Sequence, residues 1–399
     1  WLPDAAGEVS HTQPQAVLPE PHSLRSRVHE YGGMPYTLGH CSASGLDLTT
    51  DENSKPLLIW VEEADQQLYC LPFDPTNASP ADTSQRACLS GFNIGGSASH
   101  SSFRYGEPVL HAYLPWVIAI EEEHAPDAVI NRLVAFHLTQ GERKVLAEGA
   151  DFYTSPTLSP DGQKLVWVQW HHPHQPWCAS QLAALNGPLN EALGASTTPG
   201  HQILLNGEMP SAPSSLQQPR FAPNGQLYFL SDQHGFWGLY RFKDKTPDAF
   251  NTDAEPETEP VYTPDSDCGS APWQFGGRHF QFFQQDNTLK LIITQCTQGL
   301  WQLVALTLPE SLSAPITQTN ILQSRELNPV SDEQSSQPSF FSYLSIAQDQ
   351  ALYQPAPNQP QSDQSPHLIC LTAGSNQTLH LTKISLHPEA ALHQEYRQH

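Results

Sequence analysis

Hydrophobic and polar residues alternate in short runs along most of this chain, and polar turn sequences separate the runs. Runs such as 57–61 and 164–170 are rich in Leu, Val, Ile and Trp, which is typical of β-strands rather than of long helices. The stretches 155–170 and 218–232 hold the same unit, in which Pro-Asp-Gly or Pro-Asn-Gly joins an extended run to a run of β-formers. Asp-Gly and Asn-Gly tolerate left-handed backbone, so each unit predicts a β-hairpin.

This repetition predicts the architecture. A repeat of this size suits a four-stranded blade plus a long loop, so we predict an all-β fold, a β-propeller of about six to seven four-stranded blades with an incomplete first blade. The expected first strands lie at 34–38, 56–62 and 66–72, and a polar loop follows over 74–100. The next unit is expected from strands at 116–122, 132–138 and 143–148.

The pattern also predicts the domain limits. Residues 1–24 are Pro-rich and are interpreted as a remnant of the first blade or a linker, residues 25–385 as the propeller, and residues 386–399 as a polar tail. Two further loops are expected, an acidic mobile insertion over 244–259 and a low-complexity loop over 355–366.

Composition narrows the class of protein. The 399 residues include 36 Pro and 24 Gly, which suits many turns. With 18 Lys and Arg against 41 Asp and Glu, the formal charge of -23 would repel phosphate backbones, so no nucleic-acid partner is expected. No apolar run reaches the roughly 18 residues of a transmembrane helix, so no membrane partner is expected. The 7 Cys are odd in number and form no C-x-x-C, which favours free thiols and a cytoplasmic location.

Five blocks carry a resemblance to a known family. They are Arg27-Val-His-Glu-Tyr-Gly-Gly33, the segments 151–162, 170–177 and 228–241, and Pro272-Trp-Gln-Phe-Gly276. From about Arg25 onward the chain resembles the N-terminal propeller of the prolyl oligopeptidase family of serine peptidases, in its dipeptidyl aminopeptidase and acylaminoacyl-peptidase-like branch. The first block and the His-Pro-x-x-Pro-Trp loop are the most specific. Met34-Pro35 and Cys178-Ala179 depart from the family pattern.

The resemblance implies a two-domain peptidase whose propeller caps an α/β-hydrolase domain, with the active site between them. The nucleophile elbow G-x-S-x-G of that domain is absent, since Gly95-Gly-Ser-Ala-Ser-His100 lacks the second Gly. We therefore expect a chain truncated before the hydrolase domain, with no catalytic residues, inactive alone, and gating the access of short peptides to a hydrolase partner. The alternatives are a free-standing propeller that acts as a protein-interaction module and a propeller enzyme with a central metal.

Two charged clusters are candidate substrate-binding residues. Arg27, His29 and Glu30 adjoin a Gly-Gly turn, and a carboxylate there could hold a substrate amino terminus while the Arg holds a carboxylate or carbonyl. The alternative is a mutually satisfied network that fixes a strand end. Glu122 lies in an acidic run, 121–123, which is otherwise typical of a solvated loop tip.

A possible metal site and the tryptophans receive structural interpretations. His171, His172, His174 and Cys178 include metal-ligand types, but two prolines break the run, which favours a structural loop; no metal and no cofactor are expected. The tryptophans at strand and loop positions are expected to pack between blades: Trp167, Trp170, Trp177, Trp237, Trp273 and Trp301.

Overall fold

The computed structural model describes residues 17–42, 56–72, 82–91, 102–243, 256–285 and 288–308, and beyond them the strand segments 317–322, 324–325, 338–339, 343–346, 352–353, 367–373, 380–385 and 394–397. The chain divides into two compact units. Unit 1 comprises Trp1–Leu227, Asp244–Pro256 and Pro272–Gly276, and unit 2 comprises Tyr228–Lys243, Glu257–Ala271 and Gly277–His399.

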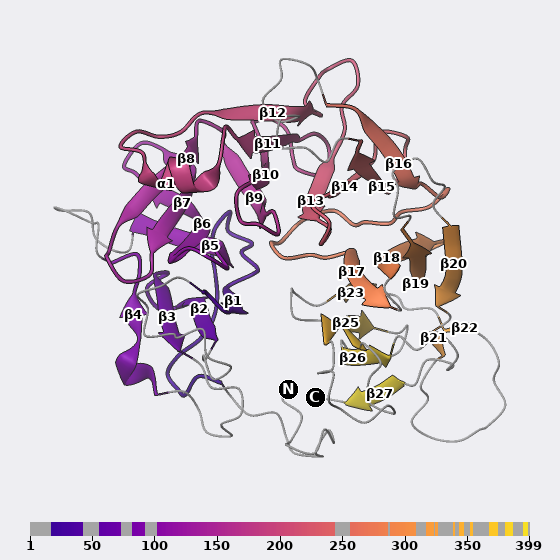
Figure 1. The fold of residues 1–399 in the computed structure, drawn as a ribbon, viewed down its shortest axis with the longest axis horizontal. Helices are drawn as coiled ribbons and strands as arrows, with labels where there is room; N and C mark the ends of the chain where they lie inside the picture. Colours follow the sequence, from indigo (N-terminus) through magenta and orange to yellow (C-terminus); the bar gives the residue numbers. More distant parts are fainter. Residues whose placement is uncertain are drawn as a thin grey trace. The chain divides into compact units, whose positions relative to one another are not determined.

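Antiparallel sheets make up almost all of the regular secondary structure of the described chain (Figure 1). Three four-stranded sheets begin it: β1 (Tyr36–Gly39), β2 (Leu57–Val61), β3 (Leu68–Pro72) and β4 (Ala87–Cys88); β5 (Phe103–Leu110), β6 (Trp116–His124), β7 (Val129–His137) and β8 (Arg143–Glu148); β9 (Phe152–Leu158), β10 (Leu165–Trp170), β11 (Gln181–Leu185) and β12 (His201–Asn206). Two more follow: β13 (Leu216–Phe221), β14 (Leu227–Ser231), β15 (Gly238–Phe242) and β16 (Thr258–Tyr262); β17 (Phe280–Gln285), β18 (Thr288–Thr297), β19 (Leu300–Thr307) and β20 (Thr317–Leu322).

The last part of the chain continues the pattern. A two-stranded sheet joins β21 (Ser324–Arg325) to β22 (Pro338–Ser339), and a five-stranded sheet contains β23 (Tyr343–Ile346), β24 (Leu352–Tyr353), β25 (His367–Ala373), β26 (His380–Ser385) and β27 (Gln394–Arg397). Besides these strands the described residues contain only the short helix α1 (Leu189–Gly194) and a 3-10 turn at Thr83–Gln85. The predicted fold class is confirmed, because successive four-stranded antiparallel sheets are the blades of a β-propeller.

Some expected boundaries need correction. The β1–β4 sheet has four strands, and its last strand, β4, lies inside the expected loop 74–100. Most of the expected first-blade remnant 1–24 lies outside the described residues. The expected tail 386–399 contributes β27, which pairs with β26. Most of the expected loops 244–259 and 355–366 lies outside the described residues, as does the Gly95–His100 segment. Among the residues that the structure describes, no helix is long and apolar enough to cross a membrane.

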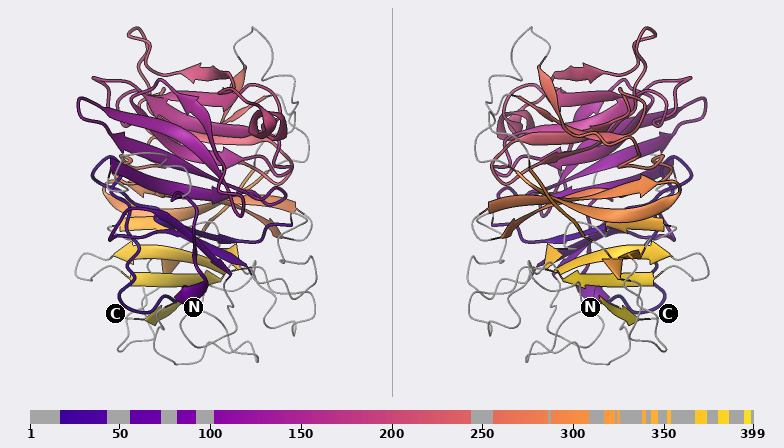
Figure 2. Two further views of the ribbon diagram at one scale, coloured as in Figure 1. Left: turned by 90° about the vertical axis from the view of Figure 1, so that its left-hand side faces the viewer. Right: turned by 90° about the vertical axis from the view of Figure 1, so that its right-hand side faces the viewer.

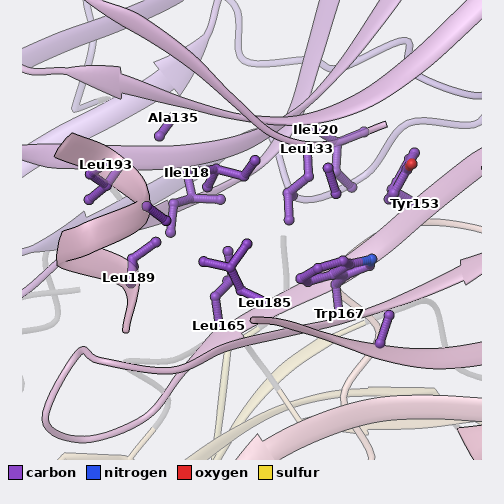
Figure 3. Packing of buried hydrophobic residues seen from close by; sticks show 14 of the residues in the cluster. Ile118, Ile120, Leu133, Ala135, Tyr153, Leu165, Trp167, Leu185, Leu189 and Leu193 are labelled. Carbon is purple, nitrogen blue, oxygen red and sulfur yellow. The ribbon is translucent and has the colours of Figure 1, made fainter. Parts of the chain in front are cut away.

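Unit 1 is held together by sheets that pack face to face (Figure 2). Alternate residues of a strand face opposite sides. Ile118 and Ile120 of β6 therefore enter one cluster with Leu165 and Trp167 of β10 (Figure 3). Val117 and Ala119 enter a second cluster, toward the β1–β4 sheet. Strand β6 is thus buried on both faces, which explains the continuous apolar run in its first five residues, Trp116–Ile120.

The first strands of successive sheets share an unusual backbone feature. A residue before proline has positive φ at Met34, Glu107, Ser155 and Gln218. Such values are uncommon outside glycine. The Glu107 amide donates to Met34 O at 3.2 Å, and the Ser155 amide donates to Glu107 Oε2 at 2.6 Å. The repeated Xaa-Pro step therefore places backbone groups where one sheet can bond to the next.

Candidate functional site

The turn over residues 29–34, just before β1, concentrates left-handed backbone in unit 1. His29, Glu30 and Met34 have φ values of 53°, 64° and 40°, and Gly32 and Gly33 have φ values of 63° and 101°. Each non-glycine residue in this left-handed region costs about 1–3 kcal/mol. Such a conformation persists only where the surroundings fix it, so the contacts of this turn identify what holds it in place.

The two glycines of the Arg27–Gly33 block are required by close packing. A Cβ atom on Gly32 would lie 1.9 Å from Ser26 O, and one on Gly33 would lie 2.5 Å from Phe275 O. Phe275 N donates to Gly32 O at 2.8 Å, and Gln274 Nε2 donates to Tyr31 O at 3.3 Å. The Pro272–Gly276 block, far away in the sequence, therefore binds the Arg27–Gly33 block directly.

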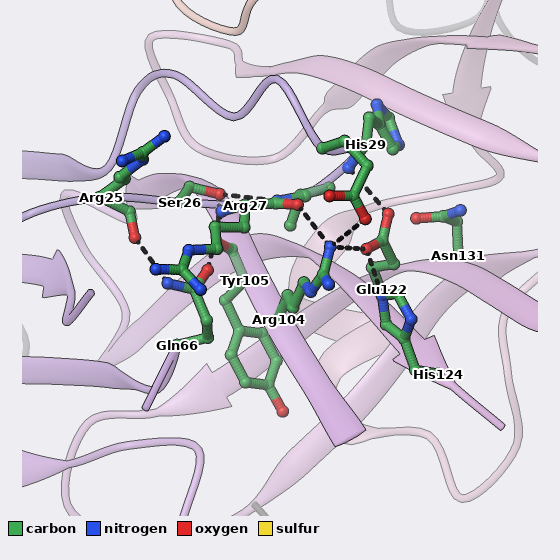
Figure 4. Close-up of polar contacts among 12 residues, drawn as sticks. Arg25, Ser26, Arg27, His29, Gln66, Arg104, Tyr105, Glu122, His124 and Asn131 are labelled. Atoms are coloured by element: carbon green, nitrogen blue, oxygen red, sulfur yellow. Dashed lines mark hydrogen bonds and ion pairs between the residues drawn. The ribbon is translucent and has the colours of Figure 1, made fainter. Parts of the chain in front are cut away.

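The residues that enter the turn are fixed from a different side. Ser26 Oγ donates to Tyr105 O at 2.7 Å, and Arg27 N donates to Gln66 Oε1 at 2.7 Å. Gln66 Nε2 in turn donates to Arg25 O at 3.0 Å (Figure 4). The chain is thus already ordered when it reaches His29.

A buried carboxylate holds the turn itself (Figure 4). Glu122, on β6, is 3% exposed, and its Oε2 accepts a hydrogen bond from His29 N at 2.8 Å. Its Oε1 lies 2.7 Å from His124 Nε2 and 3.3 Å from Arg104 Nη1. Glu122 therefore provides a hydrogen-bond acceptor for the His29 amide, where the left-handed backbone begins, and it also binds the Arg104 guanidinium beside that amide.

Arg104, on β5, links the buried carboxylate to an exposed one. Its Nη1 donates to Glu30 Oε1 at 2.6 Å and to Arg27 O at 3.0 Å, besides its contact with Glu122. The hydrogen bond from Arg104 lowers the pKa of the Glu30 carboxyl. The side chains of Glu30 and Arg27 remain 74% and 49% exposed, so these two present opposite charges to solvent.

The His29 ring lies in an aromatic enclosure. Its centroid is 5.0 Å from Phe152, 5.5 Å from Trp170 and 5.0 Å from Phe275, in edge-on geometry. Burial lowers the pKa of His29 to about 3, and the neighbouring Asn131 opposes this only in part. The imidazole is therefore neutral at pH 7, and it joins the turn to β9, β10 and the Pro272–Gly276 block.

Three aromatic side chains meet beside the turn. Tyr31 lies 5.8 Å from Trp273, ring centroid to ring centroid, and Trp177 lies 4.2 Å from Trp273. Tyr31 and Trp273 are 59% and 54% exposed. Three of the five blocks that carried the family resemblance, 27–33, 170–177 and 272–276, thus converge on one region of unit 1. The expectation that tryptophans pack between blades holds for Trp167 and is wrong for Trp273.

The four candidate residues, which the sequence places in two separate clusters, share one network in the structure. Arg27, His29, Glu30 and Glu122 do lie in one network, whereas nothing in the sequence singled out Arg104 or Gln66. The interpretation of 121–123 as a solvated loop tip is wrong, because β6 extends to His124 and buries Glu121 and Glu122. Both faces of the strand are apolar over 117–120. Because side chains alternate between the two faces, extending the strand by two residues places Glu121 and Glu122 on these same buried faces.

The possible metal ligands do not form an open site. In the part of the chain that the structure describes, one group of metal-ligand types converges, Glu30, Glu122 and His124, with ligand atoms within 4.8 Å of one another. The Arg104 guanidinium already lies between the two carboxylates, so a cation would have to displace it. His171 binds Glu208 at 2.9 Å, which ties its loop to the segment after β12.

Comparisons with known proteins show the same fold. No protein-family model matches the sequence, and no curated protein sequence matches it. A puromycin-hydrolyzing peptidase from Mycobacterium tuberculosis has a TM-score of 0.63 at 20% identity, over 95% of this chain and 47% of that chain. A puromycin hydrolase has a TM-score of 0.60 at 20% identity, over 94% and 49%. A mutant of puromycin hydrolase complexed with PGG has a TM-score of 0.51 at 20% identity, over 89% and 52%.

These likenesses place the chain in a class by its fold. The chain spans about half the length of the solved structures it matches. The predicted resemblance to the propeller of serine peptidases is confirmed at the level of the fold, which these hydrolytic enzymes share.

Proposed function

We propose that this chain is the non-catalytic, substrate-gating propeller of a serine-type oligopeptidase or aminopeptidase. The observation that carries the proposal is the convergence of three family-like blocks on one surface of unit 1, which exposes a carboxylate, a guanidinium and two aromatic rings. Conformational strain of this kind is concentrated at functional sites. The likeness to peptidases of about twice the length supports the same conclusion.

In this proposal the chemistry belongs to a partner. An α/β-hydrolase domain supplies a serine that accepts the acyl group of a peptide bond and then transfers it to water. The propeller limits access, so that short peptides reach the serine and folded proteins do not, and it excludes bulk water from the reaction. The cytoplasmic location remains part of the proposal, on the basis of the six free cysteines among the described residues.

The geometry divides the four candidate residues into two pairs. Glu30 and Arg27 are exposed, so we assign to Glu30 the ammonium group of a short peptide and to Arg27 a carbonyl or carboxylate of the same peptide. His29 and Glu122 are assigned the positioning of the turn, because Glu122 is buried and aromatic side chains enclose the His29 ring. Neither pair carries out a chemical step.

The first test uses the chain alone. The purified 399-residue chain should neither hydrolyse aminoacyl p-nitroanilides nor be labelled by a fluorophosphonate, a reagent for activated serines. A fluorophosphonate-labelled partner that co-purifies and cleaves short peptides would support the proposal. Serine-dependent turnover by the chain alone would overturn it. An unlabelled partner that cleaves nothing would instead favour a propeller that acts as a protein-interaction module.

The second test uses a peptidase assembled with this chain. Glu30→Gln should raise KM for a short peptide with a free amino terminus about tenfold, which corresponds to the loss of one charge-assisted hydrogen bond, and should leave kcat nearly unchanged. Glu148→Gln is the matched control, because Glu148 is similarly exposed and lies at the end of β8. Equal kinetics for the two variants would remove Glu30 from the substrate site.

A further inference from the structure

We propose that Tyr31 and Trp273 form a binding site for an aromatic side chain of a short peptide, with Trp177 as its support. The inference deepens the proposed function, because it names the class of side chain that the propeller selects. It can be tested on the propeller alone. Binding of an aromatic peptide by this chain requires no hydrolase partner.

The rings form a corner that is open to solvent. The Trp177 ring lies 4.2 Å from the Trp273 ring, centroid to centroid, and is tilted at 36° to it, so it contacts one side of that indole. Tyr31 stands at 66° to Trp273 at 5.8 Å. Aromatic pairs prefer edge-to-face or offset geometry with centroids about 4.5–7 Å apart. A third ring placed in this corner can meet one aromatic side chain by its edge and the other by its face.

The corner is fixed before any ligand arrives. Tyr31 is the residue with ordinary φ inside the left-handed turn, and its carbonyl accepts a hydrogen bond from Gln274. The neighbouring Gly33 and Phe275 form a parallel bridge between the two segments. Glu122 binds the turn at His29 N, and Arg104 binds it at the Glu30 side chain. Aromatic side chains on a backbone that is already ordered require no ordering of that backbone when a ligand stacks on them.

The size and surroundings of the patch favour a single side chain over a protein surface. A stable protein–protein interface buries about 800 Å² on each partner. Here the two exposed rings are flanked by polar exposed residues, Glu30 and Gln274. Apolar ring surface beside a carboxylate is complementary to a peptide with a free ammonium group and an aromatic residue. The acidic net charge of -23 also favours a cationic amino terminus over an anionic ligand.

The test compares three dipeptides that share a C-terminal glycine and differ in the first side chain, which is aromatic, a saturated ring or branched aliphatic. Phenylalanyl-glycine, cyclohexylalanyl-glycine and leucyl-glycine are titrated into the 399-residue chain, followed by saturation-transfer NMR and tryptophan fluorescence. Phenylalanyl-glycine should bind about twofold to tenfold more tightly than cyclohexylalanyl-glycine, the range expected for one aromatic contact. Trp273→Leu and Tyr31→Leu should each remove that preference.

Tyr113→Leu is the matched control. Tyr113 is 51% exposed and lies edge-on to His111, on a different turn, so its loss should leave the preference intact. Circular dichroism and the Tm of each variant exclude unfolding, and Trp273→Leu is decisive if the strained turn fails to tolerate Tyr31→Leu.

Equal affinities for phenylalanyl-glycine and cyclohexylalanyl-glycine would overturn the inference, and so would a loss of the aromatic preference in Tyr113→Leu equal to that in Trp273→Leu. Self-association of the chain that Trp273→Leu abolishes would also overturn it. The last result would make the patch a protein-docking surface. Aromatic preference without any serine peptidase partner would preserve this inference and refute the proposed function. Peptidase gating without aromatic preference would do the reverse.

Discussion

Two adjacent glutamates on β6 occupy opposite faces of one strand and meet opposite kinds of surroundings. Glu121 continues the face of Val117 and Ala119, toward the β1–β4 sheet. Arg143 binds it through Nη2 and through Nε, the latter at 2.8 Å, and Arg132 adds a contact at 3.3 Å. Tyr105 donates its hydroxyl at 3.4 Å. Glu121 is thus a fully enclosed carboxylate between two cations.

Glu122 is also buried, but its partners lead outward. It binds the amide of a strained turn and one guanidinium, and that guanidinium continues to the exposed Glu30. The difference teaches that two carboxylates buried to a similar degree on one strand can hold different parts of the structure. What separates them is the groups that they hold: two arginines on β7 and β8 of the same sheet for Glu121, and the amide of a solvent-facing turn for Glu122.

The largest expected effect concerns the enclosed face. Glu121→Ala removes the fully buried carboxylate that Arg143 and Arg132 share. Because both arginines are partly exposed and Arg132 keeps Glu123 and Glu148, we expect a cost at the lower end of the range for a broken buried pair, about 3 kcal/mol. Urea unfolding followed by fluorescence should show that loss in the free energy of unfolding. Glu123→Gln is the control, because Glu123 pairs with Arg132 from a partly exposed position, and it should change little. Equal losses of unfolding free energy in Glu121→Ala and Glu123→Gln would show that the enclosed carboxylate is no more important for stability than the partly exposed one.

For Glu122 we expect a smaller loss in the free energy of unfolding than for Glu121, together with a large local loosening of the turn over residues 29–34. Glu122→Gln weakens the bond to His29 N and the ion pair to Arg104, at a cost of about 1–3 kcal/mol. The turn should loosen, because its left-handed backbone loses its anchor. Hydrogen exchange should therefore accelerate at Gly32 N, which bonds Val28 O, much more than at amides of β7. Uniform acceleration across unit 1 would show that Glu122 is no more tied to the turn than Glu121 is.

The hairpin turns could be predicted from the sequence because the hydrogen bonds that form them join residues two positions apart. At the β9–β10 hairpin, Asp161 Oδ1 accepts from Gln163 N at 3.0 Å, and Gly162 has a φ of 72°. The equivalent Asn224 accepts from Gln226 N at 3.1 Å, beside Gly225 with a φ of 82°. These contacts span two residues, so the Asp-Gly and Asn-Gly patterns were sufficient to locate both hairpins and, through their repetition, the fold class.

The site could be predicted only in part, because its bonds join distant segments. The charged cluster at 27–30 was visible in the sequence, whereas its partner Glu122 lies 93 residues from His29 and Arg104 lies 74 residues from Glu30. Hydropathy patterns do not encode which loop meets which sheet. The same limit explains β4 and β27, whose two and four residues carry too little alternation to mark a strand.

The smallest expected effect uses pH to separate the two faces. Burial lowers the pKa of His29 from 6.5 to about 3, so the unfolded chain binds a proton between these values that the folded chain does not. The stability that neutral His29 provides is therefore complete above pH 6.5 and is lost as the pH falls toward 3. Between pH 6.5 and 5.5 the loss is about 1 kcal/mol.

The difference between the wild type and His29→Leu isolates this contribution, because the leucine cannot titrate while the other buried histidines, such as His111 and His137, remain in both proteins. Unfolding free energies measured from pH 7.5 to 5 should fall less steeply in the variant. Protection from hydrogen exchange at Gly32 N, expressed relative to the intrinsic exchange rate at each pH, should fall on acidification before protection near Glu121 does, because Glu121 contacts Arg132, Arg143 and Tyr105 and does not contact His29. Parallel pH curves for the two proteins would mean that His29 already exchanges its proton with solvent, and the turn would then be open rather than anchored.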